Sequence, residues 1–328
     1  MLNKKIKKAS FFKNIGIVGY FKQPSVLKTF KNLCTWLKNR NYRIMIEDDD
    51  SINTIKRNKN IILSNIQEMG EKSDLIIVIG GDGSMLNAIR NFSKYEQKII
   101  GINHGNLGFL NDLHPKDALN QLSKILNGSF HQEKRFLLEI QINKKKKEMI
   151  LDRAINEISF NSRKIKNMID FEVFINKNLA FFQRSNGLII STPTGSTAYS
   201  LSVGGPILSP NLNAILLVSI FPHSISSRPL LVHGNSCIQL KIKSRKGYQE
   251  INCDGQIVYS VSYGDKVLIK KSNYKVNLLH PKRFNYFKIL KSNLNRMEFS
   301  FAFMCNRNDH HQLLCIYDLH KLTCPMFL

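Results

Sequence analysis

One stretch, Asp74 to Arg90, constrains the fold of this chain more than any other. It opens with Leu75 to Ile79, an unbroken apolar run rich in β-branched residues, which suits a parallel strand covered on both faces. Gly80, Gly81 and Gly83 follow at once, so the backbone can turn sharply there and approach a ligand closely. The stretch therefore predicts a strand, a glycine turn and a helix at one edge of a parallel sheet.

A helix is expected after the turn, with Ser84 as its N-cap and Met85, Ala88, Ile89 and Phe92 on one apolar face. Free N–H groups at a helix start favour an anion, although the glycines alone leave a purely structural turn open. Asp82 lies in the middle of this turn. A carboxylate beside bound phosphates is costly unless it holds a metal or takes a proton, so Asp82 points to a working acid or base. The chain has no Walker sequence, which excludes a P-loop enzyme.

The basic composition gives the main competing signal. The chain has 48 Lys and Arg against 24 Asp and Glu, a net charge of +24, which by itself indicates a nucleic-acid-binding protein. These residues are spread over the whole length, however, and the one tight run, Lys144 to Lys147, is expected to cap a hairpin in solvent. No nucleic-acid partner is therefore expected, and a basic binding protein without catalysis remains the rival from another functional class.

Other features of the composition favour a cytoplasmic protein without a membrane partner. No apolar run approaches the roughly 18 residues that a membrane helix needs. The Lys-rich start, Met1 to Ala9, is not followed by the apolar region of a signal peptide. The six cysteines are scattered without a Cys-x-x-Cys pair, so neither a zinc site nor a disulfide framework is expected, and no residue is assigned as a metal ligand.

Strand and helix patterns alternate over residues 12–134, which predicts an α/β domain with a parallel, Rossmann-like sheet. Besides the Asp74 stretch, strands are expected at Ile15 to Val18, Arg43 to Ile46 and Lys98 to Ile102, helices from Pro24 and Pro115 and near Ile61 to Met69, and a loop at Asp48 to Asn60.

Residues 135–280 show strand patterns with little helical periodicity, which predicts a mostly β domain of the β-sandwich type. Expected strands are Phe136 to Ile142, Met149 to Phe160, Met168 to Ile175, Gly187 to Ser191, Ala214 to Ile220, Cys237 to Ile242 and Lys266 to Ile269. One hairpin is explicit, with Asn176 to Asn178 between two strand segments. The segment 281–328 is expected to return to the first domain and then to end in a poorly defined tail.

Two further stretches suggest ligand contacts. Gly101 to Leu110 contains three glycines directly after a strand, which puts a second loop at the edge where ligands of open α/β folds collect. Thr192 to Ser200 carries six hydroxyl side chains, and Thr and Ser at the start of a short helix can bind sugar or phosphate oxygens. A flexible Ser/Thr loop is the alternative, which the prolines at 193 and 206 disfavour because they stiffen its ends.

The joint order of these motifs resembles the bacterial NAD kinases, which convert NAD to NADP. The resemblance runs from about Phe12 to Phe287 and is carried by Gly80-Gly-Asp-Gly83, Gly101 to Leu110, Asn156-Glu157, Thr192 to Pro206 and Asp254-Gly-Gln256. It implies a transferase that uses ATP and Mg²⁺ or Mn²⁺ to phosphorylate the 2′-hydroxyl of the adenosine ribose of NAD. It also implies a homodimer or homotetramer.

The resemblance assigns roles to matching positions. Asp82 corresponds to the catalytic base. The NAD contacts that it implies are Asp82, Gly83, Asn156, Glu157, Asn167, Arg184, Asn186, Thr197, Ala198, Tyr199, Ser200, Leu201, Ser202 and Gln256.

Three positions depart from the family pattern: Asn186 stands where relatives often have Asp, Asn87 where many have a basic residue, and His104 replaces another residue of its loop. The alternative within the kinases is a lipid kinase of the diacylglycerol or sphingosine type, because these enzymes also carry a Gly-Gly-Asp-Gly turn. Asn156-Glu157 and the hydroxyl-rich stretch disfavour it.

Overall fold

The computed structural model describes residues 11–47, 61–105, 108–145, 148–163, 167–244 and 249–294. The chain divides into two units, Met1–Phe284 and Asn285–Leu328. The second unit contains a helix at 286–294, whereas the loop expected at Asp48 to Asn60 and most of the expected tail lie outside the described residues. No helix in the described ranges is both long and apolar enough to cross a membrane.

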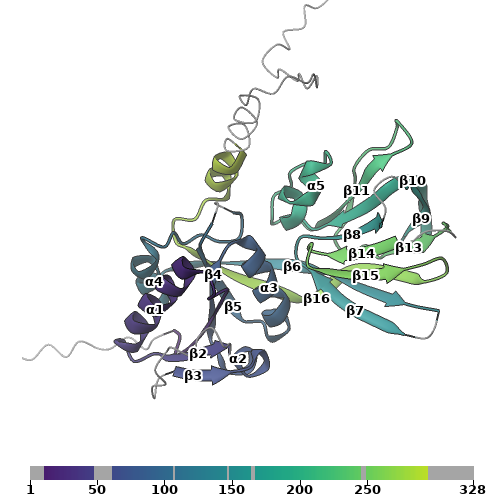
Figure 1. The fold of residues 1–328 in the computed structure, drawn as a ribbon. Coiled ribbons are helices and arrows are strands. Elements are labelled where there is room, and N and C mark those ends of the chain that lie inside the picture. Colours follow the sequence, from purple (N-terminus) through teal and green to yellow (C-terminus); the bar gives the residue numbers. More distant parts are fainter. Residues whose placement is uncertain are drawn as a thin grey trace, which may run out of the picture. The chain divides into compact units, whose positions relative to one another are not determined.

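The first half of unit 1 alternates strands and helices (Figure 1). Its elements are β1 (Asn14–Gly19), α1 (Pro24–Lys38), β2 (Arg43–Glu47), β3 (Ile61–Ser64), α2 (Ile66–Lys72), β4 (Leu75–Gly80), α3 (Asp82–Phe92), the 3₁₀ turn η2 (Ser93–Tyr95), β5 (Lys98–Asn103) and α4 (Ala118–Leu126). The strands pair in parallel in the order β5, β4, β1, β2, β3.

The central strand β4 explains the two helix layers. All six of its residues are buried, and its alternate side chains point to opposite faces of the sheet. Ile77 packs in a core shared with α1 and α4, whereas Ile76 and Val78 pack in a core shared with α2 and α3. The sheet is therefore covered on both sides, as the continuous apolar run predicted.

The second half of unit 1 is mostly antiparallel β structure. Its strands are β6 (Phe130–Asn143), β7 (Met149–Ala154), β8 (Glu157–Ser162), β9 (Ile169–Ile175), β10 (Asn178–Ser191), β11 (Ala214–Pro222), β12 (Leu230–His233), β13 (Ile238–Ile242), β14 (Gln249–Cys253), β15 (Ile257–Val261) and β16 (Lys266–Pro281), with the 3₁₀ turn η3 (Thr194–Thr197) and the short helix α5 (Tyr199–Ser202).

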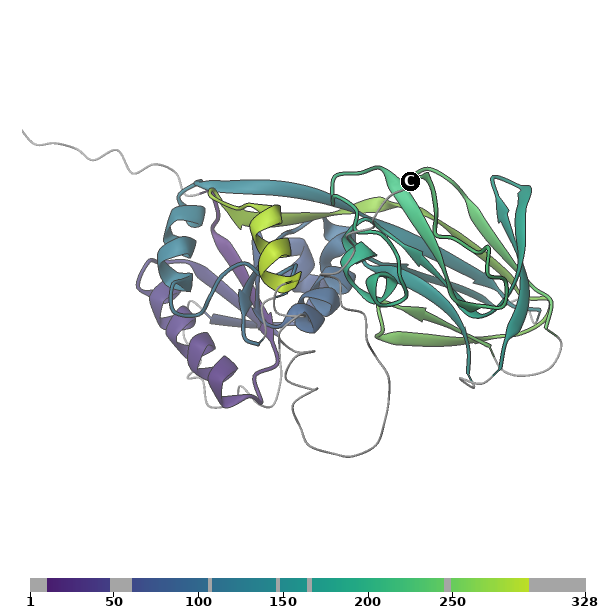
Figure 2. The ribbon, with the colours of Figure 1, turned by 90° about the horizontal axis from the view of Figure 1, so that it is seen from above.

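Two long strands, β6 and β16, join the halves. They pair antiparallel along their length, and the end of β16 pairs in parallel with β5. Figure 2 shows both strands running from the α/β half into the β half. The chain thus returns to the first sheet through β16, and the domain boundaries at 134 and 280 stay predictions.

A large buried core lies inside the second half, beside a smaller one around Leu216 and Val218. Strands far apart in the ladder contribute to the large core, for example Ile140 of β6, Phe160 of β8 and Val173 of β9. Side chains from facing layers interdigitate in this way in β-sandwiches. The expected fold class, an α/β half with a parallel sheet followed by a mostly β half, is confirmed.

The helix expected near Ile61 to Met69 was partly wrong. Ile61–Ser64 forms β3, which pairs in parallel with β2 at the sheet edge, and only then does α2 begin. Asn65 caps α2, because its side chain accepts a hydrogen bond of 2.8 Å from the N–H of Glu68. The pairing of β3 with β2 is a tertiary contact, which the local pattern of apolar residues cannot predict. Lys98–Asn103 is consequently the fifth strand, not the fourth.

The assignment of Ser84 as the N-cap of the glycine-turn helix was also wrong. α3 begins at Asp82, and Gly81 is its N-cap, since the Gly81 carbonyl accepts from the N–H of Met85 at 3.2 Å. A Cβ at Gly80 would lie 2.3 Å from the Ser84 hydroxyl oxygen, so this hydroxyl lies against Gly80. Asp82 therefore occupies the first turn of the helix, where a carboxylate is favoured by the helix dipole.

Several expected strands have different limits. Met149 to Phe160 is two strands, β7 and β8, because Ile155 and Asn156 leave the ladder between them. The strand segment expected after the Asn176 to Asn178 turn and the strand expected at Gly187 to Ser191 are one strand, β10, and β16 is much longer than Lys266 to Ile269.

The predicted hairpins are present. Asn176 and Lys177, both with positive φ, form the two-residue turn between β9 and β10, as in a type I′ turn. Lys144 lies in the turn between β6 and β7, where its N–H donates to the Glu148 carbonyl at 2.9 Å, whereas Lys146 and Lys147 of the predicted run lie outside the described residues.

Truncation of Ile77 tests the central position of β4. Ile77→Ala removes a fully buried side chain and leaves a cavity, so we expect the free energy of unfolding to fall by about 3 kcal/mol. Urea denaturation of purified protein measures this change. Ile62→Ala on the edge strand β3 is the control, because Ile62 is 45% exposed and its truncation should change stability much less. Equal effects of the two substitutions would contradict the packing described here.

Candidate functional site

The carboxylate of Asp82 is held by the loop that follows β5. Its Oδ2 accepts from the N–H of Phe109 at 2.8 Å, and its Oδ1 accepts from the Asn111 amide at 3.1 Å and the Leu110 N–H at 3.4 Å. The loop must come very close, since a Cβ at Gly108 would lie 2.1 Å from Asp82 Oδ1. Only glycine at position 108 permits this approach.

The protonation of Asp82 reflects two opposed effects. Burial raises the pKa of this carboxyl, and the hydrogen bonds from Phe109, Leu110 and Asn111 lower it, with burial the larger effect. The pKa of Asp82 is therefore above its ordinary value, which makes the ionised carboxylate a stronger proton acceptor than a solvated one.

A second carboxylate, Asp254, shapes the turn between β7 and β8. It accepts hydrogen bonds from three successive backbone N–H groups, those of Ile155 at 2.9 Å, Asn156 at 2.7 Å and Glu157 at 3.1 Å. Asp254 itself has a left-handed backbone conformation, with φ of 53°. These bonds replace the β ladder at the interruption between the two strands, and they fix the orientation of Asn156 and Glu157.

Glu157 is a buried acid that lacks a full set of partners. Its residue is 7% exposed, and its Oε2 has no hydrogen-bond partner among the described residues. Burial raises its pKa to about 8, and the neighbouring charge of Asp254 contributes to the increase. An unpaired buried polar atom is costly, so Glu157 is arranged for a group that the protein alone does not supply.

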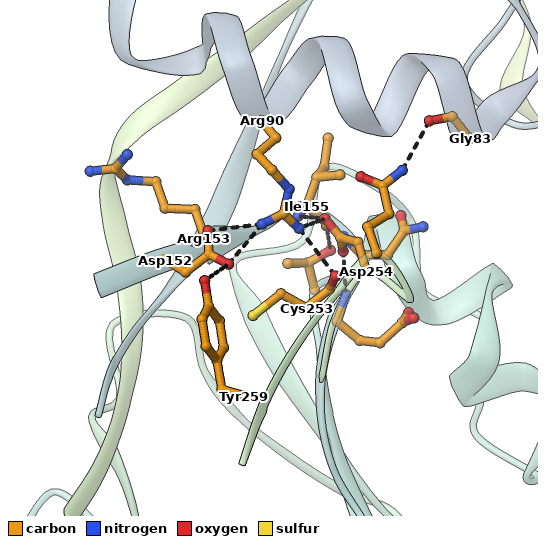
Figure 3. Close-up of polar contacts among 12 residues, drawn as sticks. Gly83, Arg90, Asp152, Arg153, Ile155, Cys253, Asp254 and Tyr259 are labelled. Atoms are coloured by element: carbon orange, nitrogen blue, oxygen red, sulfur yellow. Dashed lines mark hydrogen bonds and ion pairs between the residues drawn. The ribbon is translucent and has the colours of Figure 1, made fainter. Parts of the chain in front are cut away.

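Arg90 connects the Asp82 helix to this turn (Figure 3). Its Nη1 lies 2.8 and 2.7 Å from the two carboxylate oxygens of Asp152, and its Nη2 donates to the Cys253 carbonyl at 3.1 Å. Nη2 also lies 3.9 Å from Asp254 Oδ2. Tyr259 completes the cluster, since its hydroxyl donates to Asp152 at 3.0 Å. A single guanidinium on α3 thus contacts β7 and the end of β14.

The Asp-Gly-Gln turn after β14 reaches the glycine turn directly. Gln256 Nε2 donates to the Gly83 carbonyl at 3.0 Å (Figure 3 draws this bond). A cavity of about 550 Å³ opens beside this contact, between the end of β1 and the exposed side of α3. Tyr20, Asn87 and Gln256 are among its lining residues. Its volume is in the range of ordinary small-molecule sites.

The hydroxyl-rich stretch packs against Asn156. Thr192 donates through its N–H to the Asn156 carbonyl at 2.9 Å and through its hydroxyl to the Ile155 carbonyl at 2.5 Å. A Cβ at Gly195 would lie 2.1 Å from the Asn156 carbonyl oxygen, so glycine is required there as well. The stretch continues as η3 and α5, as expected. Ser200 of α5 is fully buried, and its hydroxyl has no partner in the described part of the chain.

The structure thus brings together most of the predicted site residues. Gln256 donates to Gly83, the chain neighbour of Asp82, and Asp254 of the same turn accepts from Asn156. Asn156 in turn accepts from Thr192, at the start of the stretch that continues into the Thr197–Ser202 segment.

Asn167 and Arg184 lie elsewhere, on or beside the β9–β10 ladder. Both are exposed, and Arg184 Nε is 3.8 Å from Asp170 on the neighbouring strand. Asn186 is half-buried on the same strand as Arg184. No contact described here joins Arg184 to Asp82 or Glu157, so a role of these three positions in NAD binding stays a prediction.

Two departures from the family pattern have defined places. Asn87 is exposed on α3, where it lines the cavity and accepts from the Asn91 amide at 3.3 Å. His104 lies 2.8 Å from the Thr29 hydroxyl through its Nε2, which makes it a link between α1 and the second glycine loop.

The described residues fit a metal that is carried by a phosphate ligand. Within these ranges no three His, Cys, Asp or Glu side chains gather as a metal centre. Mg²⁺ commonly keeps several waters and takes its other ligands from one or two carboxylates and substrate phosphates. Asp82, at the N-terminus of α3, is the carboxylate beside the position where a phosphate is favoured.

Sequence reasoning missed the residues that hold the site together. Arg90 and Asp152 received no role, although a basic residue in the last turn of α3 was visible, and Asp254 was noted only as part of a motif. Arg90 is 62 residues from Asp152 and 163 residues from Cys253 in the sequence. Such contacts have no local signal.

Two family profiles match the chain. The profile described as the ATP-NAD kinase N-terminal domain matches residues 15–130, and the one described as the ATP-NAD kinase C-terminal domain matches residues 155–281. A protein named NAD kinase from Photorhabdus laumondii is 48% identical over 284 residues, which cover 87% of this chain and 97% of that protein. A protein of the same name from Salmonella newport is 47% identical and covers 86% of this chain and 96% of that protein.

Solved structures share the fold. A yeast NADH kinase complexed with NADH aligns with a TM-score of 0.78 at 21% identity, over 93% of each chain. An NAD kinase from Archaeoglobus fulgidus in complex with ATP aligns with a TM-score of 0.66 at 23% identity, over 86% of this chain and 98% of that one.

The raised pKa of Glu157 predicts a pH dependence of stability. Its ordinary value is 4.5 and its folded value about 8, so between these values the folded state binds the proton and the unfolded state releases it. The protonated carboxyl of Glu157 therefore contributes to the free energy of unfolding fully below about pH 4.5, and this contribution is lost as the pH rises toward 8. Glu157→Gln mimics the protonated acid, so we expect the variant to gain stability over the wild type as the pH rises from 5 to 8.

Urea denaturation at several pH values measures this difference. The exposed Glu71→Gln serves as the control and should follow the wild type at every pH. A difference between Glu157→Gln and the wild type that is constant with pH would contradict the assignment of a buried, protonated acid.

Proposed function

Because the chain belongs to the ATP-NAD kinase family, we propose that it transfers the γ-phosphoryl group of ATP to the 2′-hydroxyl of the adenosine ribose of NAD, giving NADP and ADP. The observation that carries this proposal is that Arg90 and Gln256 connect the helix of Asp82 to the turn that holds Asn156 and the buried Glu157. The relatives named NAD kinase favour this activity over the lipid kinase and over a nucleic-acid-binding protein.

Asp82 is proposed as the catalytic base. It removes the proton of the 2′-hydroxyl while that oxygen attacks the γ-phosphorus, and the bond from phosphorus to the bridging oxygen of ADP breaks. The N–H groups at the start of α3 favour the negative charge of the phosphates at the same point. Positioning and charge stabilisation supply most of the catalysis in phosphoryl transfer, so the protein needs little further chemistry.

Glu157 and Asn156 are proposed to hold the ribose and neighbouring groups of NAD. A sugar hydroxyl can donate to the unpaired Glu157 oxygen, which would give that buried atom the partner it lacks. Gly83, Gln256 and the Thr197–Ser202 segment are proposed to contact the dinucleotide around this point. The fully buried hydroxyl of Ser200 supports this placement, because it too has no described partner.

ATP is the phosphoryl donor, and Mg²⁺ or Mn²⁺ is proposed to accompany it. Such an ion neutralises charge on the transferring phosphoryl group when it is bound. The cavity beside Gly83 and Asn87 is proposed to receive the donor, since it opens at the N-terminus of α3.

A cytoplasmic homodimer or homotetramer is proposed as the working form. Apolar side chains are exposed on β10 and β11 and in the loop that follows, including Phe182, Phe221 and Ile225, and these would be covered in an oligomer. Arg184 and Asn186 on β10, and Asn167 just before β9, are proposed to act in NAD binding from this part of the molecule.

A coupled assay with NAD, ATP and Mg²⁺, read through an NADP-specific dehydrogenase, tests the function. Wild type should form NADP, and Asp82→Asn should lose about 10²- to 10⁴-fold in kcat, because general-base help is worth that factor. Circular dichroism checks that the variant is folded. Near-normal turnover by Asp82→Asn would refute its role as base, and well-folded wild type that forms no NADP would refute the proposed reaction.

A further inference from the structure

Four buried charged side chains contact one another in a row, next to the loop that binds Asp82, and none of them has a role in the reaction proposed for this site. Asp112 follows the loop that binds Asp82, His280 lies near the end of β16, and Glu133 and Arg135 lie on β6. Their side chains are only 6%, 1%, 10% and 2% exposed, respectively. His280 Nδ1 contacts Asp112, His280 Nε2 lies 3.1 Å from Glu133, and Glu133 lies 2.8 Å from Arg135.

The hydrogen bonds define the protonation of His280. Both ring nitrogens face a carboxylate oxygen, and an ionised carboxylate can only accept. Both nitrogens must therefore carry a proton, which makes the ring an imidazolium. Burial lowers the pKa of His280, but the two carboxylates raise it by more. Burial also raises the pKa of Glu133, yet His280 and Arg135 outweigh this effect and bring it to about 2.

Two aromatic rings stack on the His280 imidazole. Phe284 stacks on it at 3.9 Å between ring centroids, and His131 of β6 stacks at 6.2 Å. Arg135 contacts Glu133, which in turn contacts the His280 ring. Charges thus alternate from Asp112 to Arg135, and the imidazolium is the one cation that contacts Asp112 within the described residues.

Both ends of this row of charged side chains adjoin the proposed site. At one end, Asp112 directly follows Asn111, whose amide donates to Asp82 Oδ1 at 3.1 Å. The second oxygen of Asp112 has no hydrogen-bond partner among the described residues, so within these residues His280 is what holds the Asp112 side chain. At the other end, Arg135 donates to the Thr194 hydroxyl at 3.3 Å, at the start of η3.

We propose that His280, as an imidazolium, is a positioning residue for phosphoryl transfer: it fixes Asp112 and so holds the loop that orients the Asp82 carboxylate. The inference rests on the proposed role of Asp82. Loss of the proton from His280 leaves one N–H for two carboxylates, so one of the two contacts breaks and the anchor of the loop weakens. Because NAD contacts Glu157 and the Thr197–Ser202 segment, the loss falls mainly on kcat and less on KM for NAD.

Two conservative variants test the proposal, His280→Gln and Asp112→Asn, together with their double mutant. We expect each single variant to lose at least 10-fold in kcat per folded molecule, with KM for NAD changed less than threefold. The double mutant should be no worse than the singles, because both remove the same contact. Glu139→Gln is the matched control. It removes a carboxylate of β6 that is 14% exposed and paired with Arg153 and Lys270, and kcat should stay within twofold.

The pH profile separates positioning from general stability. Wild-type kcat should fall on the alkaline side as His280 loses its proton, and this fall should be absent in His280→Gln. Nitrogen chemical shifts of His280 in the wild type, which need no variant to fold, should show both ring nitrogens protonated at pH 7. A neutral ring at pH 7, multiplicative losses in the double mutant, or a folded His280→Gln with kcat within twofold of wild type would each overturn the proposal.

Asp82→Asn keeps the two hypotheses apart. If Asp82→Asn is inactive and His280→Gln is normal, the positioning proposal fails and the base assignment stands. If Asp82→Asn remains active, the base assignment itself fails.

Discussion

Arg90 binds the helix of the glycine turn to the β half, and the rest of the site depends on this connection. One guanidinium nitrogen contacts both carboxylate oxygens of Asp152, and the other donates to the Cys253 carbonyl. The guanidinium is about as buried as its partner, at 12% and 13% exposure. Removing one partner from a buried charge pair typically costs about 3–5 kcal/mol, because the other charge stays buried without compensation. Asp82 at one end of α3 and Glu157 beside Asp254 are therefore held in one frame.

The same physical pattern recurs at two carboxylates, Asp82 and Asp254: backbone N–H groups hold the carboxylate, and burial makes it a weaker acid. Asp82 is held by the Phe109 loop and Asp254 by the Asn156 turn. Glycine at 108 and at 195 permits the close approaches that these arrangements need. Glu157 differs, because one of its oxygens is left without a described partner, and it is the group best suited to accept a hydrogen bond from substrate.

Much of the fold could be predicted from the sequence because its main elements have local signals. The apolar run of β4, the glycines after it and the two positive-φ residues at 176 and 177 each determine their own conformation. The edge strand β3 had no such signal, since its pairing with β2 makes Ile61–Ser64 extended. The break between β7 and β8 had none either, because it is caused by Asp254, 97 to 99 residues further along the chain.

The candidate site shows the same division. Its motifs could be found because glycine, carboxylate and hydroxyl residues cluster in sequence, and the family resemblance placed them in order. The supporting residues Arg90, Asp112 and His280 could not, because an isolated charged residue in a helix or strand is usually at the surface. Their roles follow only from contacts between segments far apart in the chain.

A crystal structure of the wild-type protein with NAD bound tests most directly the claim that Arg90 holds Asp82 and Glu157 around one substrate. We expect the 2′-hydroxyl of the adenosine ribose to lie within about 2.6–3.2 Å of an Asp82 carboxylate oxygen. We also expect a ribose hydroxyl to contact Glu157, with the contacts of Arg90 to Asp152 and Cys253 intact. A 2′-hydroxyl far from Asp82, or NAD bound with the Arg90 contacts broken, would contradict this claim.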